Sequence, residues 1–128
     1  MKLKVKRVYD PPESDDGVRI LVDRLWPRGV AKSRAKVDLW LKDAAPSTTL
    51  RVWFAHDPSK WGEFKQRYFR ELKEKEVVIA SIRRLAREKV VTLLYGARDV
   101  ENNNAVALRG FLEKSLSLHP KRKVSPAH

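Results

Sequence analysis

The sequence predicts a single small α/β domain with a mixed or partly parallel sheet flanked by helices. Two short apolar segments, residues 18–23 and 90–95, are rich in β-branched residues, and each is followed by a tight polar loop. The chain between them holds two segments with helical spacing of apolar residues. At 128 residues without cysteine, the chain can bury one core without disulfides. We expect residues 1–118 to form the domain and residues 119–128 a basic, disordered tail.

Two strands are predicted in the N-terminal part of the chain. Residues 2–9 alternate apolar and polar side chains, which places Leu3 and Val5 on one face of a strand. Residues 10–17 are dense in turn formers and lead into the apolar segment 18–23, a more buried strand. Residues 26–29, Trp-Pro-Arg-Gly, end that strand, since proline restricts its predecessor and glycine permits a reversal.

The sequence allows two structures for the segment that follows, residues 33–45. Alternation over residues 37–42 indicates a short extended piece, and a helix over residues 33–45 is the alternative. Residues 46–49, Pro-Ser-Thr-Thr, supply hydroxyl N-caps for a short helix that includes Trp53 and Phe54.

Two longer helices precede the last strand. Asp57 followed by Pro58 is a helix start signal, a carboxylate cap with proline in the first turn. The inward residues of the first helix are Trp61, Phe64, Tyr68 and Leu72, and those of the second are Ile79, Ile82, Leu85 and Ala86. The strand at residues 90–95 is continuously apolar, which is typical of a strand covered on both faces by helices.

A final helix follows an asparagine-rich cap. Residues 102–104 are expected to start it, and it should end near Leu118. Its inward residues should be Val106 or Ala107, then Leu108, Phe111, Leu112 and Leu116. This order of elements predicts at least one parallel strand pair, joined by a crossover through the helical middle.

Positive charge is concentrated at the two ends. The formal net charge is +12, of which residues 1–9 contribute +4 and residues 109–128 another +4. A basic tail fits polyanion binding, although a terminus that only aids solubility has the same composition.

Several protein classes are excluded or disfavoured by missing motifs. There is no apolar run of about 18 residues and no secretory signal, so we expect a cytoplasmic protein without a membrane partner. Neither a glycine-rich nucleotide fingerprint nor metal-ligand spacing is present, so no cofactor and no metal is expected. The single Met1, the lone Gln66 and the absent cysteine suggest a thermophilic source. Nothing in the sequence predicts an oligomeric state.

Charged residues follow both buried strands, and they predict a ligand pocket. Ligands of open α/β sheets bind outside the carboxyl ends of strands, so both polar ends should converge if the strands are parallel neighbours. The expected ligand-binding residues are Asp23, Arg24, Trp26, Arg28, Tyr95, Arg98, Asn103 and Asn104. Arginine forks and a helix N-terminus favour a small anionic, phosphate-containing ligand.

The same charges allow a purely structural alternative. Asp23 could pair with Arg98, and Asp99 with Arg24, closing the top of the sheet without a ligand. If the protein is an enzyme, which the sequence leaves open, the only candidates for a catalytic acid, base or nucleophile are Asp23, Asp99 and His56.

Two other functions remain as alternatives. The first is a nucleic-acid-binding accessory protein, with nonspecific contacts from the N-terminal strand, from Arg83, Arg84 and Arg87, and from the tail. The second is a protein–protein adaptor without a ligand, in which the strand-end charges pair only with each other.

Five sequence blocks point to a family. They are Arg7-Val-Tyr-Asp-Pro11, Val22-Asp-Arg-Leu-Trp-Pro-Arg-Gly29, Ala45-Pro-Ser-Thr48, His56-Asp-Pro58 and Leu93-Leu-Tyr-Gly-Ala-Arg98, the last followed by Asn103 and Ala105. These blocks resemble the YeaO-like branch of the domain of unknown function family 488, from about residue 6 to residue 112. The resemblance implies a small intracellular α/β domain of microbes. It places the family's Asp-Arg signature on Asp23 and Arg24 and its second block on Arg98 and Asn103. Many relatives carry a histidine where this chain has residues 102–104, which argues against a histidine base from that segment.

Overall fold

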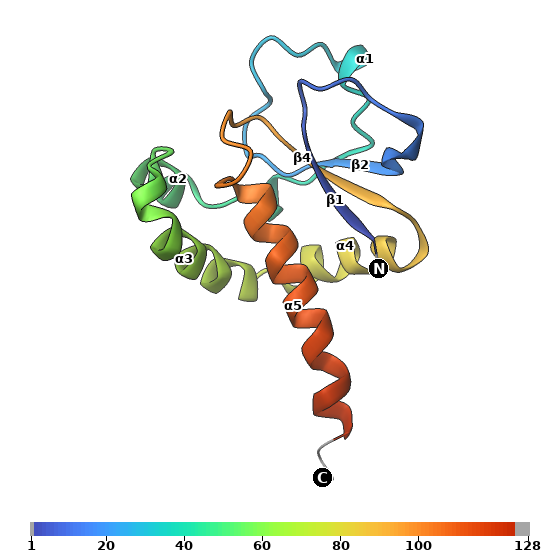
Figure 1. Cartoon of the computed structure of the whole chain (residues 1–128), viewed down its shortest axis with the longest axis vertical. Coiled ribbons are helices and arrows are strands. Elements are labelled where there is room, and N and C mark those ends of the chain that lie inside the picture. The colour runs from blue at the N-terminus through green and yellow to red at the C-terminus, as the bar shows by residue number, and fades with distance from the viewer. Residues whose placement is uncertain (1, 125–128) are drawn as a thin grey trace.

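A four-stranded, fully parallel sheet forms the centre of the molecule, in the order β1-β4-β2-β3 (Figure 1). The computed structural model describes the backbone of residues 2–124 and the side chains of residues 2–114. The strands are β1 (Leu3–Arg7), β2 (Val18–Leu21), β3 (Leu39–Trp40) and β4 (Val91–Tyr95). The parallel pairing of β2 with β4 confirms the predicted pair and its crossover. The expected α/β class is likewise confirmed, and the sheet is wholly parallel.

The described residues also form five α-helices and three 3₁₀ turns. The helices are α1 (Lys32–Ala35), α2 (Thr48–Phe54), α3 (Trp61–Lys73), α4 (Glu76–Glu88) and α5 (Asn104–Val124), and the turns are η1 (Ser14–Asp16), η2 (Lys42–Ala44) and η3 (Pro58–Lys60). The segment with two alternative predictions therefore contains one helical turn, a two-residue strand and a 3₁₀ turn. Helix α5 is described as far as Val124, beyond its expected end at Leu118. Residues 125–128 of the expected tail lie outside the described residues, and its disorder stays a prediction.

The predicted caps form as the sequence suggests. Ser47 precedes α2, and its hydroxyl accepts a hydrogen bond from the Leu50 N–H at 3.1 Å. Asp57 precedes η3, and its carboxylate accepts from the Ser59 N–H at 3.0 Å, so the chain enters α3 in a fixed direction. Asn103 precedes α5, and its side-chain oxygen accepts from the Val106 N–H at 2.9 Å.

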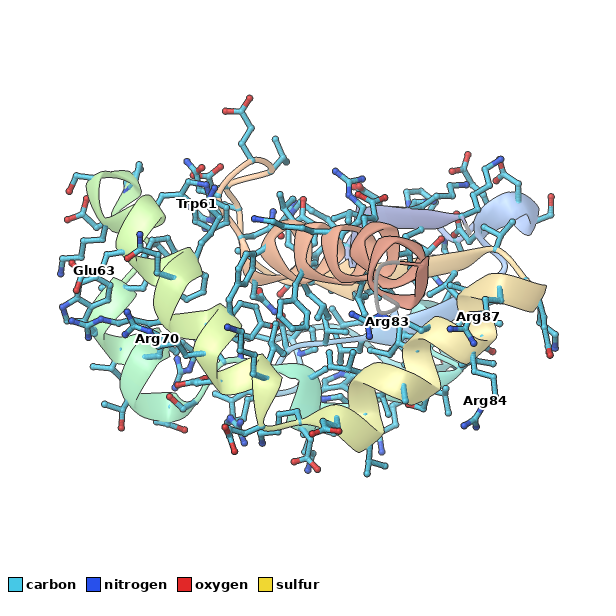
Figure 2. All side chains as sticks on the ribbon, turned by 90° about the horizontal axis from the view of Figure 1, so that it is seen from below. Trp61, Glu63, Arg70, Arg83, Arg84 and Arg87 are labelled. Atoms are coloured by element: carbon cyan, nitrogen blue, oxygen red, sulfur yellow. The ribbon has the colours of Figure 1, made fainter. Side chains whose placement is uncertain are left out.

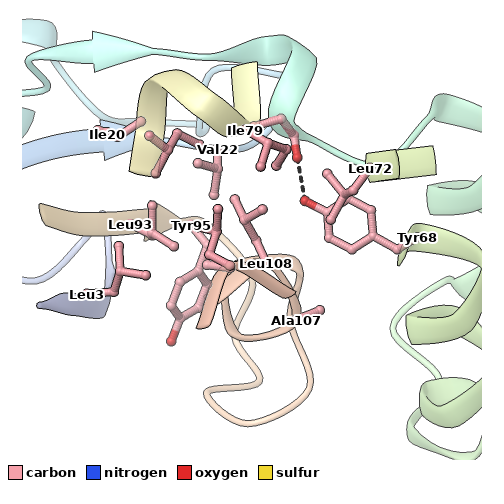
Figure 3. Packing of buried hydrophobic residues seen from close by; sticks show 14 of the residues in the cluster. Leu3, Ile20, Val22, Tyr68, Leu72, Ile79, Leu93, Tyr95, Ala107 and Leu108 are labelled. Carbon is pink, nitrogen blue, oxygen red and sulfur yellow. Dashed lines mark hydrogen bonds between the residues drawn. The ribbon is translucent and has the colours of Figure 1, made fainter. Parts of the chain in front are cut away.

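The main core lies between one face of the sheet and helices α2 to α5. Ile20, Val22 and Leu93 from the strands pack with Tyr68 and Leu108 from the helices (Figure 3). The predicted inward residues of α3 and α4 are buried at Phe64, Tyr68, Leu72, Ile79, Ile82 and Ala86, and half-buried at Trp61 and Leu85. In α5, Ala107, Leu108 and Leu112 are buried and Phe111 is half-buried, while the side chain of Leu116 lies outside the described residues.

The opposite face of the sheet is covered differently from the prediction. Leu21 and Leu94 point there and pack with Val8 and Ala35, and Trp26 and Trp40 lie against this second cluster. The covering segment is the chain from β2 to β3 with the single turn α1, on the other side of the strands from α3, α4 and α5 (Figure 1). Helices therefore cover one face of β4, and a loop fixed by tryptophans covers the other.

The basic N-terminal strand is paired rather than free. Lys6 Nζ lies 2.7 Å from Glu13 and 3.3 Å from Asp16, and Lys4 Nζ lies 3.6 Å from Asp15. Arg7 donates from Nε to the Ala97 carbonyl at 3.0 Å. Part of the charge counted at this end of the chain is therefore compensated by the turn that follows the strand.

Candidate functional site

The carboxyl ends of β2 and β4 open into a pocket of about 460 Å³. Since the two strands are parallel neighbours, the loops after Leu21 and after Tyr95 leave the sheet side by side. The N-terminus of α5 and the end of α2 complete the wall. The residues that line the pocket are Tyr9, Asp23, Arg24, Leu25, Trp26, Pro27, Arg28, Ala45, Pro46, Arg51, Phe54, His56, Phe64, Gly96, Ala97, Asn102, Asn103 and Asn104.

Asp23 forms the junction between the two strand ends. Its carboxylate accepts hydrogen bonds from the Gly96 N–H at 2.9 Å and from Asn104 Nδ2 at 3.1 Å. Asn104 Nδ2 also donates to the Val22 carbonyl at 2.9 Å, so the first residue of α5 is tied to the end of β2. A side chain at Gly96 would crowd this contact, because its Cβ would lie 3.1 Å from Asp23 Oδ2.

Burial raises the pKa of Asp23, because desolvation disfavours the charged carboxylate. The hydrogen bonds from Asn104 and Gly96 oppose this rise, and so do the charges of His56 and Arg51. Among the residues that the structure describes, Asp23 makes no salt bridge.

The arginines reach the pocket from two segments, the loop after β2 and helix α2. Arg24 is half-buried and donates from Nε to the Pro46 carbonyl at 3.2 Å, which leaves its terminal nitrogens free of described partners. Arg28 and Arg51 are exposed, and neither makes a salt bridge within residues 2–114. Arg51, on α2, was missed by the sequence reasoning, because no local pattern shows that an exposed helical residue will face a strand end.

Trp26 contributes a wall and is itself held in place. Its indole Nε1 donates to the Val30 carbonyl at 2.7 Å, and its ring meets Trp40 edge-on, with centroids 5.4 Å apart. Trp40 in turn donates to the Asp23 carbonyl at 2.8 Å. The two tryptophans therefore fix the loop that carries Arg24 and Arg28.

Three predicted site residues do not line the pocket. Tyr95 is buried in the main core, because it shares a strand face with Leu93. Arg98 is exposed beyond the strand end. Asp99 caps its own loop, where it accepts from the backbone N–H groups of Glu101 and Asn102 at 2.9 and 3.0 Å. The structure thus brings together Asp23, Arg24, Trp26, Arg28, His56, Asn103 and Asn104 but leaves these three outside.

The alternative in which the strand-end charges pair with each other is not what the structure shows. Among the described residues, neither Asp23 with Arg98 nor Asp99 with Arg24 forms a salt bridge. The pocket charges remain directed at the space between the strand ends.

His56 lies in a turn whose backbone has an unusual conformation. Ala55 and His56 both have positive φ, 46° and 57°, in the left-handed region that L-residues seldom adopt. Ala55 ends α2 there, and its N–H donates to the Arg51 carbonyl. This turn brings the exposed His56 to the pocket wall beside Phe54.

Replacing Ala55 with glycine is expected to stabilise the fold by about 0.5–1 kcal/mol. Glycine adopts the left-handed conformation without the strain of a Cβ, and this gain exceeds its greater freedom in the unfolded chain. Urea denaturation measures the change. Ala80→Gly is the control, since Ala80 is exposed in the middle of α4 and glycine there should cost about 1 kcal/mol. Equal losses in both variants would contradict the strain at Ala55.

An acidic group outside the pocket is already occupied by side-chain cations. Oxygens of Glu13, Asp15 and Asp16 lie within 4.8 Å of one another. Lys6 contacts Glu13 and Asp16, and Arg19 contacts Asp16. This group therefore forms a structural ion-pair network.

The helical face away from the pocket carries the other arginines considered for polyanion binding. Arg84 and Arg87 are exposed on α4 (Figure 2). Arg83 is half-buried, with Nε and Nη2 buried and without hydrogen-bond partners. Burial, and then repulsion from Arg87, lower the pKa of Arg83. This face is distinct from the strand-end pocket.

These features define a small α/β protein with a parallel sheet and a polar pocket at the carboxyl ends of its central strands. Among the described residues, no helix is both long and apolar enough to cross a membrane. The chain belongs to the DUF488-N3i family, described as the inactive DUF488-N3 subclade, whose family model matches residues 2–127. The resemblance inferred from the sequence blocks is thereby confirmed.

The relatives that match this chain include two uncharacterized bacterial proteins, each covered over most of its length. The uncharacterized protein YeaO of Escherichia coli K12 is 41% identical over 112 residues, which cover 88% of this chain and 97% of YeaO. An uncharacterized protein of Mycobacterium tuberculosis H37Rv is 40% identical over 111 residues, which cover 87% of this chain and 93% of the relative. No solved structure matches the chain.

Proposed function

We propose that the strand-end pocket binds a small anionic ligand that contains a phosphate group. The observation that carries the proposal is the convergence of Arg24, Arg28 and Arg51 on a pocket lined by one carboxylate, Asp23. Guanidinium groups bind phosphate oxygens in a bidentate fork, and unpaired arginines at a pocket have this capacity available.

Helix α5 adds a second source of positive potential. Asn103 and Asn104 at its start line the pocket, so the N-terminal end of the helix dipole faces the same space. The description of the subclade as inactive supports binding rather than turnover. A binding assay is therefore the first test.

A thermal-shift screen with nucleotides and sugar phosphates tests the proposal. A ligand present at 100 times its dissociation constant stabilises the folded state by about 2.7 kcal/mol. Arg24→Ala and Arg51→Ala should each weaken the affinity by about tenfold to a hundredfold, because each removes charge-assisted hydrogen bonds. Arg84→Ala is the matched control, since it removes the same charge from the exposed face of α4.

Salt separates this proposal from nonspecific polyanion binding. A pocket ligand should still shift the melting temperature at high salt, whereas counterion release makes nonspecific nucleic-acid binding fall steeply. A shift seen only with oligonucleotides, lost at high salt and equal in all three variants, would overturn the pocket proposal and favour the nucleic-acid alternative. No shift with any phosphate compound would also overturn it.

A further inference from the structure

The charges of the pocket are divided between its floor and its rim. Asp23 and Arg24 are half-buried beyond the ends of β2 and β4, whereas Arg28 and Arg51 are exposed. A phosphate group in contact with Asp23 would be repelled by the carboxylate, and at the rim it meets cations. A ligand that contacts both places would therefore need an anionic group at the rim and a different group at Asp23.

Asp23 keeps acceptor capacity after its described contacts are counted. Each of its carboxylate oxygens accepts one hydrogen bond, Oδ1 from Asn104 and Oδ2 from Gly96. An ionised carboxylate offers about four lone-pair sites, so about two remain for a ligand.

Asn104 adds a further acceptor, and its orientation is fixed by chemistry. Its Nδ2 donates to the Val22 carbonyl and to Asp23 Oδ1, and both of these atoms are acceptors. A flipped amide would place its oxygen against two other oxygens, so the nitrogen must face them. Oδ1 of Asn104 is left without a donor among the described contacts, and the residue lines the pocket.

A neutral hydrogen-bond donor fits these acceptors. Arg51 lines the same pocket and its charge acts on Asp23, so the carboxylate already has a cation near it. A hydroxyl group donates to carboxylate and amide oxygens without adding charge.

We propose that the pocket takes a phosphate ester that carries several hydroxyl groups, with the hydroxyls on Asp23 and Asn104 and the phosphate at the Arg28 and Arg51 rim. This inference rests on the proposed anion-binding function and narrows its ligand class. Free pentose phosphates and ribonucleotides share this chemistry. A volume of about 460 Å³ falls within the range of pockets that bind small molecules.

Calorimetric titration of the full chain with ribose 5-phosphate and with phenyl phosphate tests the inference. Both are phosphate monoesters, but only the sugar carries hydroxyl donors. The wild-type chain should bind ribose 5-phosphate at least about tenfold more tightly, as expected for two or more hydrogen bonds, one of them to a charged group. Equal affinity for the two compounds would overturn the hydroxyl proposal while leaving anion binding intact.

The variants Asp23→Asn and Asn104→Ala test whether these two residues cause the preference for ribose 5-phosphate over phenyl phosphate. Each should reduce the preference for ribose 5-phosphate to about threefold or less, and Asp23→Asn should not weaken phenyl phosphate binding, because it removes a repelling charge. Arg51→Ala should weaken both compounds by a similar factor and keep their ratio. If both Asp23→Asn and Asn104→Ala keep the full preference for ribose 5-phosphate, the hydroxyl groups are bound elsewhere, and their placement on Asp23 and Asn104 is wrong.

Two further measurements complete the experiment. Thermal melts of each variant without ligand verify that it is folded, and Asn104→Ala provides the test if Asp23→Asn is not. AMP distinguishes the sources of the ligand chemistry: tighter binding than ribose 5-phosphate supports a ribonucleotide, and equal or weaker binding supports a free sugar phosphate. If neither ribose 5-phosphate, AMP nor phenyl phosphate binds, the proposed function fails together with this inference.

Discussion

Replacement of Gly17 with alanine is expected to destabilise the protein by about 3–5 kcal/mol, a large part of the 5–15 kcal/mol typical of a domain. Gly17 links η1 to β2 with φ 68° and ψ −137°, a conformation essentially confined to glycine. An added Cβ would lie 2.1 Å from the Val90 carbonyl oxygen, which is backbone that cannot rotate away. The same oxygen accepts the hydrogen bond from the Val18 N–H that starts the pairing of β2 beside β4.

Urea denaturation of Gly17→Ala measures this loss, and Gly110→Ala is its control. Gly110 lies in α5, and a Cβ added there would meet no atom within 4 Å, so alanine should stabilise the helix by about 0.5–1 kcal/mol. A loss below about 1 kcal/mol in Gly17→Ala would show that the β2 entry can rearrange, contrary to the strain argument.

Asp16→Asn is expected to cost about 3–5 kcal/mol, because it leaves a buried arginine without its counter-charge. Asp16 and Arg19 are 1% and 4% exposed, and Arg19 Nη1 donates to the Asp16 carboxylate at 2.5 Å. The Arg19 guanidinium also donates to the Ala35 carbonyl at 2.7 Å, so the pair fastens the loop before β3 to the start of β2. Asp43→Asn, at an exposed carboxylate, should change stability by less than about 0.5 kcal/mol.

The same carboxylate predicts an acid-dependent loss of stability. Burial alone would raise the pKa of Asp16, but hydrogen bonds from the Glu13 N–H, Lys6 and Arg19 outweigh it and hold the pKa below the ordinary value of 3.8. A carboxyl group whose pKa is lowered by folding stabilises the protein above the unfolded pKa, and this contribution is lost as pH falls through the folded pKa. The free energy of unfolding of the wild type, followed by urea titration at decreasing pH, should therefore fall below pH 3.8. A parallel decline in Asp16→Asn would assign the effect to other carboxylates.

The helices and strands that could be predicted from the sequence are those that pack one face against the core, because this packing gives their apolar residues a regular spacing. Phe64, Tyr68 and Leu72 recur at helical spacing and are buried, so α3 was predictable from its pattern. The Tyr68 hydroxyl donates to the Ala44 carbonyl (Figure 3), and no local pattern could predict this contact, because the partner lies 24 residues earlier in the chain.

The strand-end position of the pocket was predictable, but its exact membership was not. Asp23 and Asn104 follow from the rule that polar residues at parallel strand ends converge. Tyr95 was misplaced although period two puts it on the core face with Leu93, a signal that was available in the sequence. Arg51 depends on how α2 docks, which is a tertiary effect.

The burial of Asp16 and Arg19 shows another limit. Asp16 lies in the segment dense in turn formers and Arg19 follows it directly, and charged residues are ordinarily exposed in such a place. Only their mutual pairing, together with the contacts of Lys6 and Ala35, makes burial favourable, and those partners come from other parts of the chain.

The strand order also determines when the domain can form during synthesis. β4 lies between β1 and β2, and these two N-terminal strands pair with β4 rather than with each other. A nascent chain that ends before Val91 therefore lacks the strand that joins β1 to β2, and β1 is left without its only strand partner among the described residues. Contacts of such long sequence separation slow folding and prolong the exposure of unpaired strand edges. The ribosome must therefore release the chain through Tyr95 before β1 and β2 can join one sheet.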